Sequence, residues 1–305
     1  MSRPKEAKVV PRTKVPVIEL KGTKKTVKIG GTYTPVIVGE RINPTNRKAL
    51  IEKLKAGEFD VLDEEAKKQV ENGADILDIN VGVPGIDEKH AMLEALRIVQ
   101  DAVEVPLWID TSDPAVLAEA LKNVQGRPGI NSTTGEEARM DIVIPLAAEY
   151  DAALVGLTID DAGIPMTTEK RVEIAGRIID RAEKAGLDRK NIIIDCVALA
   201  CGTSDTGARA TLDTIRTVTE TYGVNTTLGL SNASFGLPAR PKLNATFMLM
   251  CAGEGMSCFI GNPSDPEMGF ALKASKLFWG EDKFAMGYLK FYRKWQAELE
   301  AKAKK

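Results

Sequence analysis

Acidic and amide side chains follow most of the apolar segments of this 305-residue chain. They are Glu40, Asn43, Asp78, Asn80, Asp110, Asn131, Asp160, Asp161, Asp195, Asn232 and Asn262. Carboxylates accept hydrogen bonds, whereas carboxamides both donate and accept them. This set suits a flat heterocycle that presents amino, ring N–H and carbonyl groups at fixed angles. Because Asp and Asn also cap helices, we expect roughly half of these residues to serve only as caps.

Metal and phosphate ligands fit these residue types less well. A phosphate would require cations or a Gly-rich loop, and few Lys or Arg stand at the segment ends. A divalent metal is the alternative, since hard cations bind carboxylate and carbonyl oxygens. The four cysteines lack C-x-x-C spacing, which favours buried, reduced thiols and a cytoplasmic location over a zinc site at Cys196 and Cys201. His90, the single histidine, is expected to be solvated or capping.

The elements that position these side chains alternate regularly from Val36 onward. Eight apolar segments are each followed by a helical stretch, and continuous apolar segments are typical of parallel strands buried on both faces. Eight such units predict a (β/α)₈ TIM barrel, whose strand ends meet at one rim. No Gly-rich dinucleotide loop follows the first strand, so a doubly wound sheet is disfavoured. The sequence therefore predicts a barrel domain with a C-terminal helix over residues 35–305 and a separate N-terminal segment over residues 1–34.

The segment 1–34 is rich in Lys and Arg, and its two short β-like runs predict an N-terminal basic arm or hairpin. The net charge of the whole chain is −2, which gives no bulk attraction to nucleic acid or membrane. No apolar run approaches the roughly 18 residues that span a bilayer. The basic N-terminus also lacks the apolar core of a secretory signal, which again favours the cytoplasm.

The segment ends resemble a known family as an ordered set. The motifs are GERIN, DINVG, IDTS, INSTTG, VGLTIDDAGIP, IIIDC and LGLSNASFGLPARP, in that order between Val36 and Asn262. Together they resemble the pterin-binding methyltransferases, in particular the methyltetrahydrofolate:corrinoid protein methyltransferases and the folate domain of cobalamin-dependent methionine synthase. The resemblance implies a dihydropteroate-synthase-like barrel, a homodimer, and methyl transfer between N5 of methyltetrahydrofolate and the cobalt of a corrinoid carried by a partner protein.

The resemblance also implies roles for individual residues. Asn232 would be the catalytic residue beside N5, and Asp110, Asn131 and Asp195 would hold the pterin ring. The remaining substrate-binding residues would be Glu40, Asp78, Asn80 and Arg240, the last of these contacting substrate or the corrinoid partner. Phe235 departs from the family, which often has Gln at this position.

Two alternatives remain open at the level of sequence. The first is a dihydropteroate-synthase-like enzyme, although the Lys-containing loop and Ser-Arg pair of that class have no counterpart in the SNAS and IGNPSD segment ends. The second is a non-catalytic pterin-binding partner of a corrinoid protein. Binding without turnover would indicate the second alternative.

Overall fold

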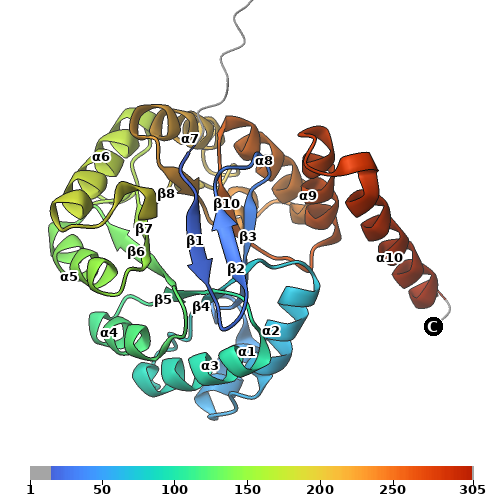
Figure 1. Cartoon of the computed structure of the whole chain (residues 1–305), viewed down its shortest axis with the longest axis horizontal. Coiled ribbons are helices and arrows are strands. Elements are labelled where there is room, and N and C mark those ends of the chain that lie inside the picture. The colour runs from blue at the N-terminus through green and yellow to red at the C-terminus, as the bar shows by residue number, and fades with distance from the viewer. Residues whose placement is uncertain (1–14, 304–305) are drawn as a thin grey trace, which may run out of the picture.

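Eight parallel strands form a barrel at the centre of the computed structural model, which describes residues 15–303 (Figure 1). The strands are β3 (Val36–Ile42), β4 (Ile76–Ile79), β5 (Leu107–Asp110), β6 (Gly129–Thr134), β7 (Ala153–Leu157), β8 (Ile192–Asp195), β9 (Asn225–Thr227) and β10 (Cys258–Gly261). They are hydrogen-bonded in the order β10-β3-β4-β5-β6-β7-β8-β9. A parallel bridge between Gly229 and Ile260 joins the two end strands, so the barrel is nearly closed.

The helices form a ring around these strands (Figure 1). They are α1 (Lys48–Lys55), α2 (Val61–Glu71), α3 (Glu88–Ala102), α4 (Pro114–Asn123), α5 (Glu137–Glu149), α6 (Thr168–Lys184), α7 (Gly207–Tyr222), α8 (Arg240–Glu254), α9 (Pro266–Phe278) and α10 (Met286–Ala303). Short 3-10 turns are η1 (Arg189–Asn191), η2 (Leu230–Ser234) and η3 (Lys283–Ala285). The predicted (β/α)₈ barrel is therefore confirmed.

The apolar pattern of the strands explains the two cores of the molecule. All four residues of β4 are buried, as expected for a strand covered on both faces. Leu77 and Ile79 pack outward into the main core beneath the helices, whereas Ile76 and Trp108 belong to a separate cluster inside the barrel. A Cβ at residue 129 would lie 2.6 Å from the Trp108 ring, so Gly129 on the neighbouring strand leaves room for this large side chain.

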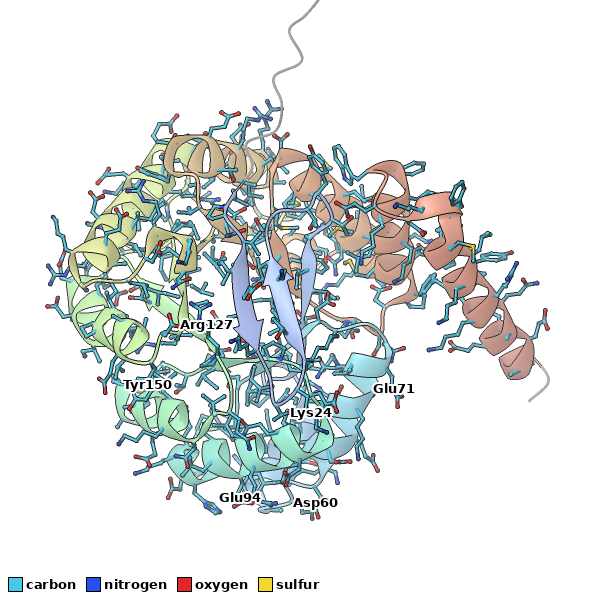
Figure 2. All side chains as sticks on the ribbon, in the orientation of Figure 1. Lys24, Asp60, Glu71, Glu94, Arg127 and Tyr150 are labelled. Carbon is cyan, nitrogen blue, oxygen red and sulfur yellow. The ribbon has the colours of Figure 1, made fainter. Side chains whose placement is uncertain are left out.

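A hairpin of β1 (Ile18–Lys21) and β2 (Thr26–Ile29) covers the amino-terminal ends of the barrel strands (Figure 1). Its buried side chains, including Leu20, join the cluster inside the barrel. Arg127 donates to the carbonyl oxygen of Glu19, and Lys24 pairs with Glu104 at 3.0 Å. Figure 2 shows Lys24 at the tip of the hairpin and Arg127 beside the hairpin. The hairpin expected in the N-terminal segment is therefore present, while residues 1–14 lie outside the described part.

The C-terminal helix packs on one neighbour and projects from the ring (Figure 1). Phe270 of α9 makes edge-to-face contacts with Phe291 and Trp295 of α10, both at 4.9 Å between ring centroids. Phe278 and Phe284, which precede the projecting helix, are 83% and 93% exposed. Among residues 15–303, no helix has the length and apolar character required to cross a bilayer.

Candidate functional site

The polar side chains expected to form a site stand at the carboxyl-terminal ends of the strands, opposite the hairpin. Hydrogen bonds connect these strand ends: Asn80, just beyond β4, donates to Asp110 of the neighbouring β5, and Asn131 of β6 donates to Asp78 of β4, one strand further along. Ser231 of η2 donates to Glu40 of β3 at 3.4 Å, near the place where β9 and β10 close the barrel. The barrel therefore brings together side chains that lie up to 191 positions apart in the chain.

The ends of β4, β5 and β6 form what we call the paired half of the site, made of Asp78, Asn80, Asp110 and Asn131. Nδ2 of Asn131 donates to Oδ1 of Asp78 at 3.0 Å, and Nδ2 of Asn80 donates to Oδ2 of Asp110 at 2.9 Å. The carbonyl oxygen of the Asn80 side chain accepts from the backbone N–H of Gly82. Each carboxyl thus has an amide partner, and the amide orientations are fixed by the network before any ligand arrives.

Burial changes the acidity of both carboxyls in the paired half. It raises the pKa of Asp78, which is 2% exposed, and the neighbouring Asp110 carboxylate raises it further. Burial likewise raises the pKa of Asp110, while hydrogen bonds from Asn80 and from the Asp78 carboxyl act in the opposite direction. Asp78 is therefore the carboxyl of this pair that holds a proton more readily, and Asp110 is the better acceptor for an incoming N–H group.

The ends of β8 and β9 form the open half of the site, made of Asp195 and Asn232. Oδ1 of Asp195 accepts from the backbone N–H of Val197 at 2.8 Å, and no side chain of residues 15–303 hydrogen-bonds its carboxyl. Burial raises the pKa of Asp195 to about 7, opposed by that N–H and by the charge of Arg171. This carboxyl has acceptor capacity that a bound heterocycle could use.

The sequence position of Asn232 suggested the end of a strand, but the residue lies in the 3-10 turn η2. Its side chain is exposed and hydrogen-bonds no other side chain in the described residues. A Cβ on Gly229 would come within 3.0 Å of Nδ2 of Asn232, so glycine there leaves space for the amide. Arg240 donates to the carbonyl oxygen of Ser231 at 2.8 Å and thereby braces the turn. Its guanidinium also lies 5.9 Å from the ring centroid of Phe235.

Several other strand-end residues serve local turns. Asn43 accepts from the N–H of Thr45, and Asn262 accepts from the N–H of Ser264. Asp160 accepts from Arg177 at 3.1 Å, and Asp161 is exposed. These four expected positions take no part in the hydrogen-bonded network of the site.

Metal and thiol chemistry finds little support in the described residues. Within 15–303 no group of three or more His, Cys, Asp or Glu side chains is placed to hold a metal ion. Burial raises the pKa of the Cys196 thiol, which lies in the main core, whereas Cys201 is exposed. His90 lies in the first turn of α3 and contacts Phe59 edge-on.

Two arginines that sequence reasoning missed support the strand ends. Arg139 of α5 donates to the carbonyl oxygens of Thr111 and Ser132 at 2.8 and 3.0 Å, next to Asp110 and Asn131. Arg171 of α6 makes the corresponding contacts at the end of β8. Both stand in the first turn of a helix, where the helix dipole disfavours cations. First-turn cations also occur at Lys89, Arg209 and Lys242, so this position does not distinguish the two arginines in the sequence.

A cavity of about 590 Å³ lies far from these strand ends, beside the hairpin. Most of its charged side chains pair with one another, among them Lys28 with Glu19 and Arg127 with Asp151, each at 3.0 Å. This end of the barrel therefore presents mainly paired charges, whereas the opposite end has buried carboxyls with raised pKa values.

Comparison with known proteins places the chain in a family. Residues 39–262 match the family model described as pterin binding enzyme, so the chain belongs to the pterin-binding enzyme family. It is 35% identical over 265 residues to a methylcorrinoid:tetrahydrofolate methyltransferase of Eubacterium limosum, covering 85% of this chain and 96% of that protein. The resemblance seen in the sequence motifs is thereby confirmed.

Longer relatives and solved structures extend the comparison. Over 245 residues the chain is 35% identical to methionine synthase of Mycobacterium leprae. The matched region covers 75% of this chain but only 20% of that larger protein. A dihydropteroate synthase from Xanthomonas albilineans in complex with 7,8-dihydropteroate matches with a TM-score of 0.67 at 19% identity, over 86% of this chain and 98% of that one. At this identity the structural likeness shows the barrel fold and no more.

Proposed function

We propose that this chain is a methyltransferase that moves a methyl group between N5 of methyltetrahydrofolate and the cobalt of a corrinoid carried by a partner protein. Support comes from the family match, from the relative that is 35% identical along nearly its whole length, and from the hydrogen-bonding groups at the strand ends. The dihydropteroate-synthase alternative has the fold in its favour, but the Lys-containing loop and the Ser-Arg pair of that class have no counterpart in the SNAS and IGNPSD segments.

The pterin ring would be held by Asp110, Asn131 and Asp195. In their ionised forms the two carboxylates accept hydrogen bonds from the ring's amino and N–H groups. Asn131 donates one N–H to Asp78, so its second N–H and its carbonyl oxygen remain for the ring. The observation that carries this assignment is the buried Asp195 carboxyl, which accepts only the backbone N–H of Val197 and hydrogen-bonds no side chain of residues 15–303.

The other residues of the paired half would act on those that touch the ring. Asp78 orients Asn131, and Asn80 orients Asp110, through the hydrogen bonds already described. Glu40 would line the site beside Ser231, and burial raises the pKa of its carboxyl. Each of these groups limits the rotamers of its partner, which lowers the cost of ordering the site when substrate binds.

Asn232 would act at N5, where negative charge develops as the methyl group leaves. When the methyl group moves from methyltetrahydrofolate to cobalt, the corrinoid, in its Co(I) state, would supply the nucleophile. An amide N–H cannot readily give up a proton, but it stabilises developing charge or holds a water that delivers one. Arg240 braces the turn that carries Asn232, which fixes where this donor points.

The test is anaerobic mixing of the purified chain with methyltetrahydrofolate and free cob(I)alamin, followed by absorbance. Loss of the Co(I) band with growth of methylcobalamin supports the methyltransferase. Binding of methyltetrahydrofolate by calorimetry, without turnover by free cobalamin or by any corrinoid protein, would indicate the non-catalytic alternative. Absence of both binding and turnover would overturn the pterin assignment.

We further propose a cytoplasmic homodimer. All four cysteines are free, which is usual in a reducing compartment. Phe278, Phe284 and Met286 expose large apolar surfaces beside α10, and a second copy of the chain would cover them. Light scattering at micromolar concentration tests the dimer, and a monomeric mass would refute it. Fractionation of cells that express the native chain tests the location.

A further inference from the structure

Arg171 is a fully buried arginine whose contacts all go to main-chain carbonyls and one hydroxyl. Its side chain is 0% exposed in the first turn of α6. Nη1 donates to the carbonyl oxygens of Cys196 and Val197, each at 3.0 Å, and to Oγ1 of Thr211 at 3.2 Å. Nε donates to the carbonyl oxygen of Pro165 at 2.9 Å. One side chain thus ties the loop after β7, the end of β8 and helix α7 together.

The backbone that Arg171 holds has an unusual conformation. Val197 has φ +53°, in the left-handed region that β-branched residues rarely adopt. In this conformation its N–H points back to Oδ1 of Asp195 at 2.8 Å, the single hydrogen bond made to that carboxyl within the described residues. Thr211 adds a second bond, at 2.8 Å, to the carbonyl oxygen of Val197. Strained backbone persists only where surrounding contacts enforce it, and here those contacts come from Arg171 and Thr211.

The charge of Arg171 also lacks an ordinary partner. No carboxylate of residues 15–303 lies within ion-pair distance of it, and its Nη2 has no hydrogen-bond partner there. Burying a cation without a carboxylate is costly, and the cost is only partly offset by carbonyl dipoles. The groups that interact with its charge are the Cys196 thiol and, second, the Asp195 carboxylate.

We infer that Arg171 is a positioning residue for the pterin site: it locks the turn at Cys196 and Val197, and that turn fixes where the Asp195 carboxylate points. The inference rests on the proposed role of Asp195 in pterin binding. Arg171 itself does not touch the substrate and acts only through the residues it holds.

A purely structural role would make a different prediction from a positioning role. An arginine that only stabilised the fold would leave the affinity for pterin unchanged at pH values where Asp195 is ionised. A positioning arginine would change both the affinity for pterin and its pH dependence, because its charge lowers the pKa of Asp195. The other groups that face this carboxyl are the buried thiols of Cys196 and Cys258, both with pKa values raised by burial. They remain neutral near pH 7 and do not compete with Arg171.

The experiment compares the parent protein with Arg171→Met by calorimetric binding of methyltetrahydrofolate from pH 5.5 to 9. We expect about tenfold weaker binding at pH 7, the scale of losing a charged hydrogen-bond donor. We also expect the midpoint of the affinity profile to move to higher pH, since losing the cation raises the pKa of Asp195. A folded variant with unchanged affinity and an unchanged midpoint would overturn the inference.

Two further variants separate geometry from charge. Arg171→Lys keeps the cation but cannot span the same carbonyls, so it should restore the midpoint while binding several-fold more weakly than the parent; binding as tight as the parent's would overturn positioning. Arg181→Met is the matched control, since Arg181 lies on the same helix but is exposed and pairs with Asp141. It should leave both affinity and midpoint unchanged.

A readout without pterin covers the other ways in which the experiment could fail. Carbon-detected NMR follows the titration of the Asp195 carboxyl, assigned by the loss of its signal in Asp195→Asn. A higher pKa in Arg171→Met supports the inference, and an unchanged pKa overturns it.

If the parent binds no pterin, the proposed function fails while this titration still tests Arg171. If Arg171→Met does not fold, Thr211→Val removes one support of the turn, and unchanged pterin affinity together with an unchanged Asp195 pKa would overturn the inference.

Discussion

The paired half and the open half of the site are built in opposite ways. In the paired half, both carboxyls receive hydrogen bonds from amide side chains, so the network is complete without substrate. In the open half, Asp195 has one backbone N–H and Asn232 is exposed without a side-chain partner among the described residues. Under the proposed function, Asp110 and Asn131 of the paired half and Asp195 of the open half recognise the flat ring, and Asn232 of the open half is the group that changes its interactions during the reaction.

The largest expected effect is on the rate in Asn232→Ala. We expect methyl transfer to slow about 10²–10³-fold, the scale of losing one donor to developing charge, with pterin binding largely retained. Stopped-flow absorbance with cob(I)alamin measures the rate, and calorimetry measures binding. A variant that transfers methyl at the parent's rate would show that Asn232 does not act at N5.

Substitution of the ring-holding carboxylates should affect binding before it affects rate. Asp195→Ala and Asp110→Ala should each weaken methyltetrahydrofolate binding about 10- to 100-fold, because the ring's donors lose a charged acceptor. Asp161→Ala is the control, since Asp161 is exposed and outside the network. If Asp195→Ala bound pterin as tightly as the control, the open half would not contact the ring.

The two halves should also differ in what they contribute to folding. Asn131→Ala leaves the buried Asp78 carboxyl without its amide donor and should lower the free energy of unfolding by about 1–3 kcal/mol. Asn232→Ala removes an exposed side chain and should change it by less than about 0.5 kcal/mol. Urea unfolding of both variants at pH 7 makes the comparison, and equal losses would show that the halves are not distinct.

The sequence predicted the two halves unequally. Strands, helices and the polar strand ends follow from apolar periodicity, and eight strand–helix units sufficed to indicate the barrel. Helix α1 buries only Leu50 and Leu54, so the sequence has little apolar periodicity there to indicate it. The SNAS segment was expected to end a strand, but β9 stops at Thr227 and the segment forms η2. The pairing of amides with carboxyls was not predictable, because it depends on which strand ends become neighbours.

The arginines behind the strand ends show a further limit of sequence reasoning. Arg139 and Arg171 bind mainly main-chain carbonyl oxygens, which every residue carries, so no complementary residue type marks their partners. The left-handed conformation of Val197 was equally hidden, since nothing in a valine indicates it. Their first-turn positions, unfavourable to the helix dipole, do not mark them either, since Lys89, Arg209 and Lys242 also stand in first turns.

The smallest expected effect is the pH dependence of pterin binding. The pKa of Asp195 is raised to about 7, and the ring should bind the ionised carboxylate. Affinity should therefore rise about tenfold between pH 6 and 8 in the parent, as the fraction of ionised Asp195 rises.

The pH dependence of stability has the opposite sign. Burial of this carboxyl favours the protonated folded form, so its contribution to the free energy of unfolding falls as pH rises through about 7. Asp195→Asn cannot ionise and should show weaker binding with a flatter profile, leaving only the contributions of Asp78 and Asp110. A profile equally steep in Asp195→Asn would assign the titration to the paired half instead.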